Sequence, residues 1–150
     1  SERELAQIRE ELTEQGYLRK QKGKQRPQAA LPPLEFTSSD GFKILVGRNN
    51  TQNDKLTLKI ANKNDMWLHT KDIHGSHTVV FAEGREISDT AILEAAQLAA
   101  YYSKARESSQ VPVDYTLVRY VSKPSGARPG MVIYVNNKTV YVTPKANISE

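Results

Sequence analysis

Asp65–Phe81 reads DMWLHTKDIHGSHTVVF, and the interpretation of the whole 150-residue chain depends on this stretch. Its two ends, Met66–Thr70 and Thr78–Phe81, are rich in β-branched and aromatic residues and predict two strands. Lys71–His77 between them contains a Gly-Ser pair and predicts a tight turn. The stretch also holds the single tryptophan and all three histidines of the chain. Rare residue types gathered so closely indicate a site, although Trp67 also suits a core anchor.

Similar patterns predict further strands on both sides of this stretch. The turn Ser39-Asp40-Gly41 separates the first two, because its glycine can adopt positive φ. Asn136-Asn137-Lys138 separates the last two, which are therefore predicted to pair as a hairpin. The segments that predict these outer strands are Leu34–Ser38, Phe42–Val46, Val113–Val121, Met131–Val135 and Thr139–Thr143.

One long helix is predicted between the two groups of strands. Ser88 or Asp89 caps it, and it runs to about Arg106 with alanines and other apolar residues on one wide stripe. The small alanine side chains permit a close approach to a sheet. We therefore expect this helix to pack on the strands.

Lys55–Ala61 is ambiguous, because its apolar residues fit both the alternation of a strand and the stripe of a helix. A short helix capped by Thr51 or Asn53 is the favoured interpretation. About six strands and one long helix, without βαβ alternation, predict an α+β fold. We expect a mainly antiparallel sheet with the long helix packed on it.

The N-terminal part of the chain has a different character. Residues 1–20 carry apolar residues at three- and four-residue spacing and predict the end of a coiled-coil helix. Residues 21–33, QKGKQRPQAALPP, are basic and proline-rich and predict a linker. Residues 34–150 are predicted to form one domain. The chain is expected to be a piece of a longer protein whose helical arm precedes this domain.

Composition excludes several classes of protein and favours a polyanionic partner. The chain has no cysteine, which excludes disulfides and thiolate metal sites and fits a reducing compartment. Neither an apolar run long enough to span a membrane nor an apolar signal segment is visible. The net charge is +4, and residues 19–26 and 115–149 are two basic runs without acids. Each run alone also fits solvated surface, but two runs around one domain favour a polyanion.

Polar and basic side chains suited to RNA gather in several segments. Trp67 and a histidine can stack on bases, and the backbone at Gly75 and Ser76 can approach a phosphate closely. The amide-rich segment Gly47–Asp54, GRNNTQND, predicts a loop whose side chains can bond bases or phosphates, although such loops often only form turns. The cations expected to neutralise phosphate are Arg48, Lys71, Lys123 and Arg128, and the amides are Asn49, Asn50, Gln52 and Asn53.

Metal binding and catalysis fit these residues less well. His69, His74 and His77 match the usual number of protein ligands to catalytic zinc, but their spacing is not helical and glycine interrupts it. Ser76 and His77 are adjacent, which does not bring the imidazole to the hydroxyl, and the nucleophile elbow and the P-loop are absent. We therefore predict no metal, no cofactor and no enzymatic activity. A protein-binding surface is the alternative to RNA binding.

Five segments in this order resemble the NFACT-R (NFACT RNA-binding) module, the C-terminal module of the RqcH and NEMF proteins of ribosome-associated quality control. They are GFKILVGRNNTQND, DMWLH, IHGSH, EAAQLAAYYSKAR and VDYTLVRYVSKPSGARPGMVIYVNNKT, and the resemblance covers about residues 34–144. The family often has proline at His74, which weakens a three-histidine site. The residues that match the family's patterns are Gly47, Arg48, Asn49, Gln52, Asn53, Asp54, Asp65, Trp67, His69, Gly75, Ser76 and His77.

The resemblance implies an RNA-binding part of a larger machine in the cytoplasm. Full family proteins recognise a large ribosomal subunit blocked by peptidyl-tRNA and recruit alanyl-tRNA. The ribosome then adds C-terminal alanines to the stalled chain. The module is therefore expected to contact large-subunit RNA and tRNA, with no insertion into a membrane. Bacterial members are also called fibronectin-binding proteins, so an adhesin that binds fibronectin at the cell surface is the alternative.

Overall fold

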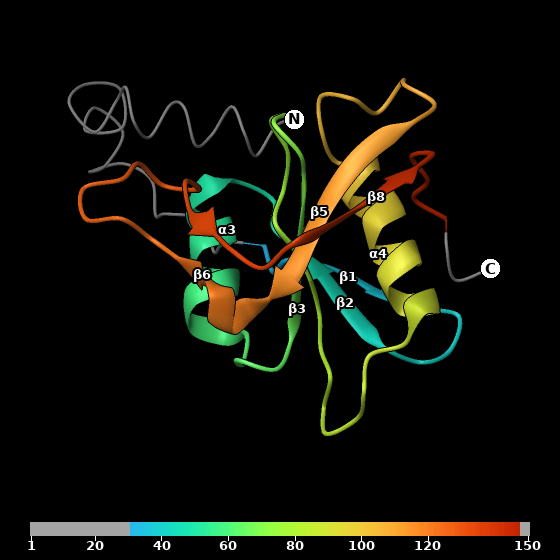
Figure 1. The fold of residues 1–150 in the computed structure, drawn as a ribbon, viewed down its shortest axis with the longest axis horizontal. Helices are drawn as coiled ribbons and strands as arrows, with labels where there is room; N and C mark the ends of the chain where they lie inside the picture. The colour runs from blue at the N-terminus through green and yellow to red at the C-terminus, as the bar shows by residue number, and fades with distance from the viewer. Residues whose placement is uncertain (1–30, 148–150) are drawn as a thin grey trace, which may run out of the picture. The chain divides into compact units, whose positions relative to one another are not determined.

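The computed structural model describes residues 31–147 of the chain (Figure 1). The predicted coiled-coil helix and most of the predicted linker lie outside the described residues, so both stay predictions. The described residues from Pro33 onward belong to one compact unit. Within residues 31–147, no helix has the length and apolar character needed to cross a membrane.

Six strands form one sheet in which every neighbouring pair is antiparallel. Their order across the sheet is β1-β2-β4-β3-β5-β8. A separate two-stranded sheet joins β6 and β7. The strands are β1 (Leu34–Thr37), β2 (Lys43–Val46), β3 (Met66–Thr70), β4 (Thr78–Val80), β5 (Val111–Leu117), β6 (Val121–Ser122), β7 (Ile133–Tyr134) and β8 (Lys138–Val142).

The long helix α4 (Asp89–Tyr101) lies against one face of the six-stranded sheet (Figure 1). Ser88 caps it, because its hydroxyl accepts a hydrogen bond from the amide of Ala91. Buried alanines of α4 pack against apolar side chains from the strands, among them Leu68 and Val113. The predicted α+β fold with a helix packed on an antiparallel sheet is confirmed.

Shorter elements lie against the opposite face of the sheet. The helix α3 (Asn50–Lys55) continues into the π-helix η1 (Leu56–Ile60), and the 3₁₀ turn η2 (Val118–Tyr120) links β5 to β6. Leu56 from η1 and Val121 from β6 share a second apolar cluster with Trp67 from β3. The sheet therefore has a core on each face, and the second core lies beside the predicted site.

The amide-rich segment Gly47–Asp54 is largely helical, so its prediction as a loop is wrong. Its N-cap is Asn49, not Thr51 or Asn53, and the Asn49 side chain accepts a hydrogen bond from the Gln52 amide at 2.8 Å. Gln52 Oε1 accepts a second bond from the Arg48 amide at 2.7 Å. Side-chain amides thus satisfy backbone donors at the helix start, which turns a loop-like composition into a capped helix.

The C-terminal strands differ from the predicted hairpin. β7 pairs with β6 and β8 pairs with β5, so the two segments on either side of Asn136 join different sheets. Asn136 has a φ of 59°, and Thr116 Oγ1 donates to the carbonyl groups of Val135 and Asn136, which holds the chain at this crossing. The predicted strand Val113–Val121 likewise ends at Leu117, where η2 redirects the chain.

Candidate functional site

Trp67 is buried at the centre of a cluster of rings. Its ring centroid lies 5.8 Å from that of His69, 5.4 Å from that of His77 and 4.6 Å from that of Tyr134. The side chain is 1% exposed, and its indole Nε1 has no hydrogen-bond partner among the described residues. An indole so buried offers no face to a base. In this structure Trp67 is the core anchor, and the expectation that it stacks on RNA is not met.

His77 is buried in a set of hydrogen bonds that fixes its protonation. Its Nε2 lies 3.0 Å from the Gly130 carbonyl, which can only accept, so Nε2 carries the hydrogen. Nδ1 then accepts from the Thr57 hydroxyl at 2.7 Å. Burial, with a smaller contribution from His69, lowers the pKa of His77 to about 3. The imidazole is therefore neutral at physiological pH and binds two segments together.

His77, which directly precedes β4, is joined to the helix α3 through Asn53. Asn53 is 3% exposed, and its side-chain oxygen accepts a hydrogen bond from the His77 amide at 3.1 Å. The Gly47 amide donates to the His77 carbonyl at 3.0 Å. His77 therefore lies against the Gly47–Asp54 segment. Asn53 bonds protein backbone there and has no free surface for RNA.

Gly47 is required because Asn53 occupies the place of a side chain. A Cβ atom at residue 47 would lie 1.9 Å from Asn53 Oδ1 and 3.2 Å from the Asn53 Cα. We expect Gly47→Ala to lower the free energy of unfolding by about 1–3 kcal/mol, the usual cost of overpacking. Urea denaturation monitored by circular dichroism measures this. The cost should shrink in an Asn53→Ala background, and an equal cost in both backgrounds would contradict the clash.

Asp65 is a buried structural carboxylate that anchors the start of β3. It is 2% exposed, and its two oxygens accept from the amides of Ala82 and Asn62 at 2.9 and 2.7 Å. Its carbonyl accepts from the Val118 amide at 2.9 Å. These bonds hold three chain segments at one end of the sheet. Direct contact of Asp65 with RNA is therefore not supported by its position.

Gly75 and Ser76 face the segment after α4 rather than an open surface. The Ser76 amide donates to the Tyr102 carbonyl at 3.1 Å, and Gly75 forms a β-bridge with Ser103. A Cβ atom on Gly75 would lie 2.8 Å from the Ser103 Cβ. The glycine thus permits close packing of two chain segments. The Ser76 amide is already bonded, so it is not free to receive a phosphate.

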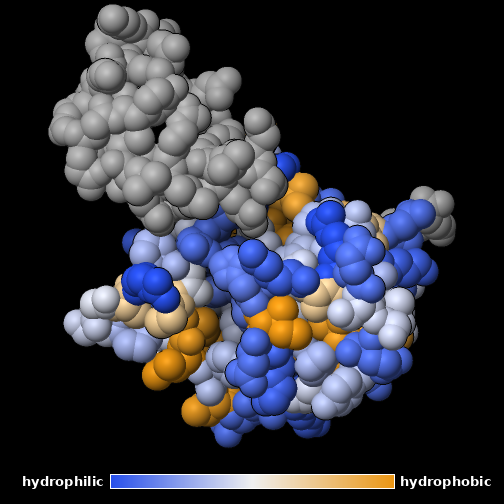
Figure 2. Space-filling view, turned by 90° about the horizontal axis from the view of Figure 1, so that it is seen from above, coloured by the Kyte–Doolittle hydropathy of each residue, from blue (hydrophilic) through white to orange (hydrophobic). Residues whose placement is uncertain are grey.

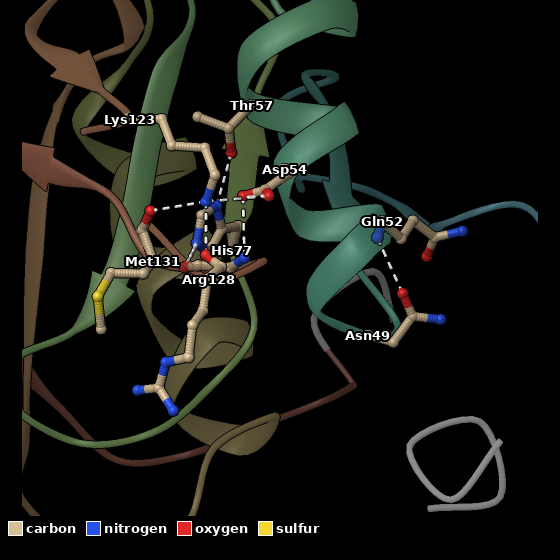
Figure 3. A network of polar contacts seen from close by, with 9 residues as sticks. Asn49, Gln52, Asp54, Thr57, His77, Lys123, Arg128 and Met131 are labelled. Atoms are coloured by element: carbon tan, nitrogen blue, oxygen red, sulfur yellow. Dashed lines mark hydrogen bonds and ion pairs between the residues drawn. The ribbon is translucent and has the colours of Figure 1, made fainter. Parts of the chain in front are cut away.

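A second polar network joins the segment Lys123–Met131 to α3 (Figure 3). Asp54 accepts a hydrogen bond from the Gly130 amide at 3.0 Å and lies 3.2 Å from the Lys123 ammonium. Lys123 also donates to the carbonyl groups of Arg128 and Met131, at 2.5 and 3.0 Å. With the His77–Gly130 bond, Asp54, His77, Lys123 and Gly130 form what we call the clamp.

Of two predicted RNA-binding residues near the clamp, Arg128 is exposed, whereas the Lys123 ammonium is bonded within the protein. Arg128 is exposed, and Figure 3 shows its guanidinium pointing away from the clamp. The Lys123 ammonium is held between a carboxylate and two carbonyl groups. The Asn50 side chain packs closely against Gly130, since its amide oxygen would lie 2.7 Å from a Cβ atom at that residue. The capping pair Asn49 and Gln52 lies apart from this network (Figure 3).

Asp114 is a buried acid that sequence reasoning missed. It is 1% exposed and accepts hydrogen bonds from Tyr134 and Thr139, both at 2.6 Å. The Lys71 ammonium lies 3.9 Å from its carboxylate. Burial and this carboxylate raise the pKa of Tyr134. An acid in the middle of an otherwise apolar strand was the available signal, because such a group requires partners.

His69 lies between Trp67 and the loop that follows β3. Its Nδ1 is 2.7 Å from the Thr70 carbonyl and its Nε2 is 3.2 Å from the Gly75 carbonyl. Burial lowers the pKa of His69, which these two carbonyl groups oppose. His74 is exposed, unlike His77. Within residues 31–147, no group of three or more histidine, aspartate or glutamate side chains is placed to hold a metal ion.

The predicted residues therefore fall into two sets. Asp65, Trp67, Asn53 and His77 are buried and form a framework. At the surface, exposed large apolar side chains are distributed over several elements, and Figure 2 shows such patches between hydrophilic residues. The predicted cations and amides that are exposed or half-buried are Arg48, Asn49, Asn50, Gln52, Lys71, Lys123 and Arg128.

Comparison with known proteins gives one family and several relatives. Residues 33–136 match the family model described as NFACT protein RNA binding domain. A Bacillus subtilis (strain 168) protein named Rqc2 homolog RqcH is 51% identical over 150 residues, covering 98% of this chain and 26% of that protein. The protein of the same name from Streptococcus suis (strain 05ZYH33) is 46% identical over 142 residues. The chain thus spans about a quarter of the length of these relatives.

A solved structure has the same fold. It is the C-terminal part of the fibronectin/fibrinogen-binding protein from Streptococcus suis, with a TM-score of 0.84 and 45% sequence identity. The match covers 97% of this chain and 58% of that one.

Proposed function

This chain belongs to the NFACT RNA-binding domain family, and from that premise we propose that it is the RNA-binding module of a ribosome-associated quality control factor. In this proposal the whole protein acts in the cytoplasm on obstructed large ribosomal subunits. It binds tRNA there and supports the addition of alanines to the C-terminus of the stalled chain. The module itself binds RNA and carries no chemistry of its own.

The observation that supports this proposal most directly is the display of a basic loop by the clamp. Lys123–Met131 contains Arg128 with no acidic residue, and the nearest acid before it in the sequence is Asp114. Asp114 is buried, whereas Arg128 is exposed. A loop held in place in this way suits a phosphate backbone, because Arg128 can meet a phosphate without a further cost of ordering the loop.

Salt dependence tests RNA binding directly. We expect fluorescence anisotropy with a labelled RNA to give an affinity that falls steeply as salt rises, since phosphate contacts release counterions. Arg128→Ala should weaken binding and reduce the slope of log affinity against log salt by about one contact. An affinity that stays flat from low to moderate salt would contradict phosphate binding. Co-sedimentation of the full-length protein with large subunits tests the ribosomal part separately.

Asp54→Asn gives a test in which two explanations predict opposite signs. The change removes an acid beside the basic loop and raises the net charge by one from +4, so charge alone predicts tighter RNA binding. If the clamp orders the loop, binding should instead weaken, roughly 2- to 10-fold for the ordering that is lost. Anisotropy at fixed salt measures the sign.

Glu107→Gln is the matched control for Asp54→Asn. Glu107 is exposed and lies outside the clamp, so neutralising it should leave RNA affinity unchanged or slightly tighter. Asp54→Asn that binds RNA more tightly than Glu107→Gln would show that the loop needs no ordering by Asp54. Thermal melting of each variant confirms that the comparison is made between folded proteins.

Binding of fibronectin or fibrinogen is a second candidate function. It is favoured by one observation, the solved structure of the same fold from a protein described as fibronectin/fibrinogen-binding. Basic surfaces also bind acidic polymers without specificity, and such binding fades with salt. Specific binding should persist at physiological salt and should survive Arg128→Ala. The location of the full-length protein in intact cells separates the two candidates further.

A further inference from the structure

Burial of Trp67 leaves the domain without the aromatic side chain that was expected to meet RNA bases. In residues 31–147 the exposed side chains among phenylalanine, tyrosine and tryptophan are Tyr120 at 37% and Tyr141 at 63%. Tyr141 has the largest exposed fraction of the exposed large apolar side chains in this part of the chain. An aromatic ring on the open surface of a sheet is the group on which RNA-binding sheets commonly stack bases.

Tyr141 lies on the face of the sheet that turns away from α4. It is in the edge strand β8, where Val140 and Val142 pack into the core under the helix. Because successive side chains of a strand alternate between faces, Tyr141 and Thr139 project to the opposite face. Both are exposed there. The α3–η1 segment and the β6–β7 pair cover Trp67 on this face, but the end at β8 stays open.

The neighbours of Tyr141 suit one nucleotide. Its cross-strand partner in β5 is Pro112, which is half-buried. The Lys71 amide donates to the Pro112 carbonyl at 2.9 Å, which places a cation beside the same strand pair. The Lys71 side chain is 47% exposed, and its ammonium is 3.9 Å from the Asp114 carboxylate, a long and loose ion pair. That ammonium can contact a phosphate while an exposed ring supports the adjoining base.

Resting on the proposed function of RNA binding, we propose that Tyr141 is a stacking platform for an unpaired base, with Lys71 beside it for the neighbouring phosphate. A base within a duplex is already stacked on both sides and presents no free face to a protein. The ligand class of this end of the sheet is therefore single-stranded RNA. In this proposal the basic loop at Arg128 contacts the phosphate backbone of the RNA, and that contact requires no unpaired bases.

The test compares one unstructured RNA of about 12 nucleotides with the same strand annealed to its complement. Stacking on an aromatic side chain contributes about 1–3 kcal/mol per base, so Tyr141→Thr should weaken binding of the single strand roughly 5-fold or more. Tyr141→Phe keeps the ring and should bind within about twofold of wild type. Affinity for the duplex should not change. The salt slope should also stay constant, because stacking releases no counterions.

Threonine keeps strand propensity at an exposed site, so the Tyr141→Thr chain is expected to fold. Tyr120→Thr is the matched control, because it removes the other exposed tyrosine and should leave single-strand affinity unchanged. An equal loss for the single strand and the duplex in Tyr141→Thr would overturn the stacking platform, as would no loss at all. A wild-type chain that binds neither RNA would overturn the proposed function, and the platform with it.

A direct measurement is photo-crosslinking with an RNA that carries 5-iodouridine. The crosslink should map to Tyr141 in the wild-type chain and disappear in Tyr141→Thr. A crosslink that maps to Tyr120 instead, with Tyr141 unlabelled, would move the platform to η2 and contradict the assignment.

Discussion

Trp67→Ala is expected to lower the free energy of unfolding by about 3–5 kcal/mol, the usual cost of truncating a buried tryptophan. The side chain is 1% exposed and packs against Tyr134 and His77. It also contacts apolar residues from η1 and β6, so its loss opens a cavity between the sheet and the elements on that face. A loss of this size is a large part of the stability of a small domain.

The measurement is urea denaturation monitored by far-ultraviolet circular dichroism. Fluorescence is unsuitable because Trp67 is the single tryptophan of the chain. Leu93→Ala is the matched control, since Leu93 is 45% exposed and its truncation should cost little. Trp67→Phe should be intermediate in stability and should keep RNA binding. A cost below about 1 kcal/mol for Trp67→Ala would contradict its role as the core anchor.

The stability of the domain is expected to fall as the pH is lowered from 7 to 5, and His77 is expected to be a main cause. The pKa of His77 is about 3 in the folded chain, whereas histidine has a pKa near 6.5 when unfolded. Between these values the unfolded state binds a proton that the folded state does not. The free energy of unfolding therefore rises with pH, by about 1.4 kcal/mol per unit well below pH 6.5. From pH 7 to 5 the loss attributed to His77 is roughly 2 kcal/mol.

His77→Gln removes this titration and should flatten the pH profile between 7 and 5. The variant should be less stable than wild type at pH 7, because glutamine cannot keep both the Thr57 and the Gly130 bonds of the ring. His74→Gln is the control, since His74 is exposed, and its profile should parallel that of wild type. Burial also lowers the pKa of His69, so a smaller slope of the same sign should remain in His77→Gln. A His77→Gln profile parallel to that of wild type would contradict the buried neutral imidazole.

The sheet could be predicted from the sequence because local patterns determine most of it. β-branched runs bounded by turn residues placed β1 to β4 closely, and Ser88 marked the start of α4. The pairing of the C-terminal strands could not be predicted in the same way. β6 and β7 have two residues each, and their pairing depends on the redirection of the chain by η2 after Leu117. A pattern of alternation carries no information about such a change of sheet.

Site residues were located better than their roles were assigned. Trp67 and His77 do lie together, and His77 bonds Asn53 of the Gly47–Asp54 segment, whereas Asp65 bonds Asn62 and Ala82 instead. Whether such side chains are exposed depends on which distant segment covers them, here η1 and the β6–β7 pair. The polar side chains of Gly47–Asp54 were expected at the surface, yet Asn53 bonds the backbone of His77 and Asp54 bonds the backbone of the basic loop. Polar residues that recur in a pattern can therefore hold a binding surface in place without forming it.

The clamp joins positions that are far apart along the chain, which has a consequence for the protein during its own synthesis. Asp54 bonds Gly130 across 76 positions, and His77 bonds it across 53. Contacts of such high sequence separation form late in folding, because the intervening chain must be ordered first. A growing chain that has emerged only as far as β5 lacks both the basic loop and β8. The domain should therefore acquire its affinity for RNA only when its last strands leave the exit tunnel, so that unfinished copies do not compete for RNA.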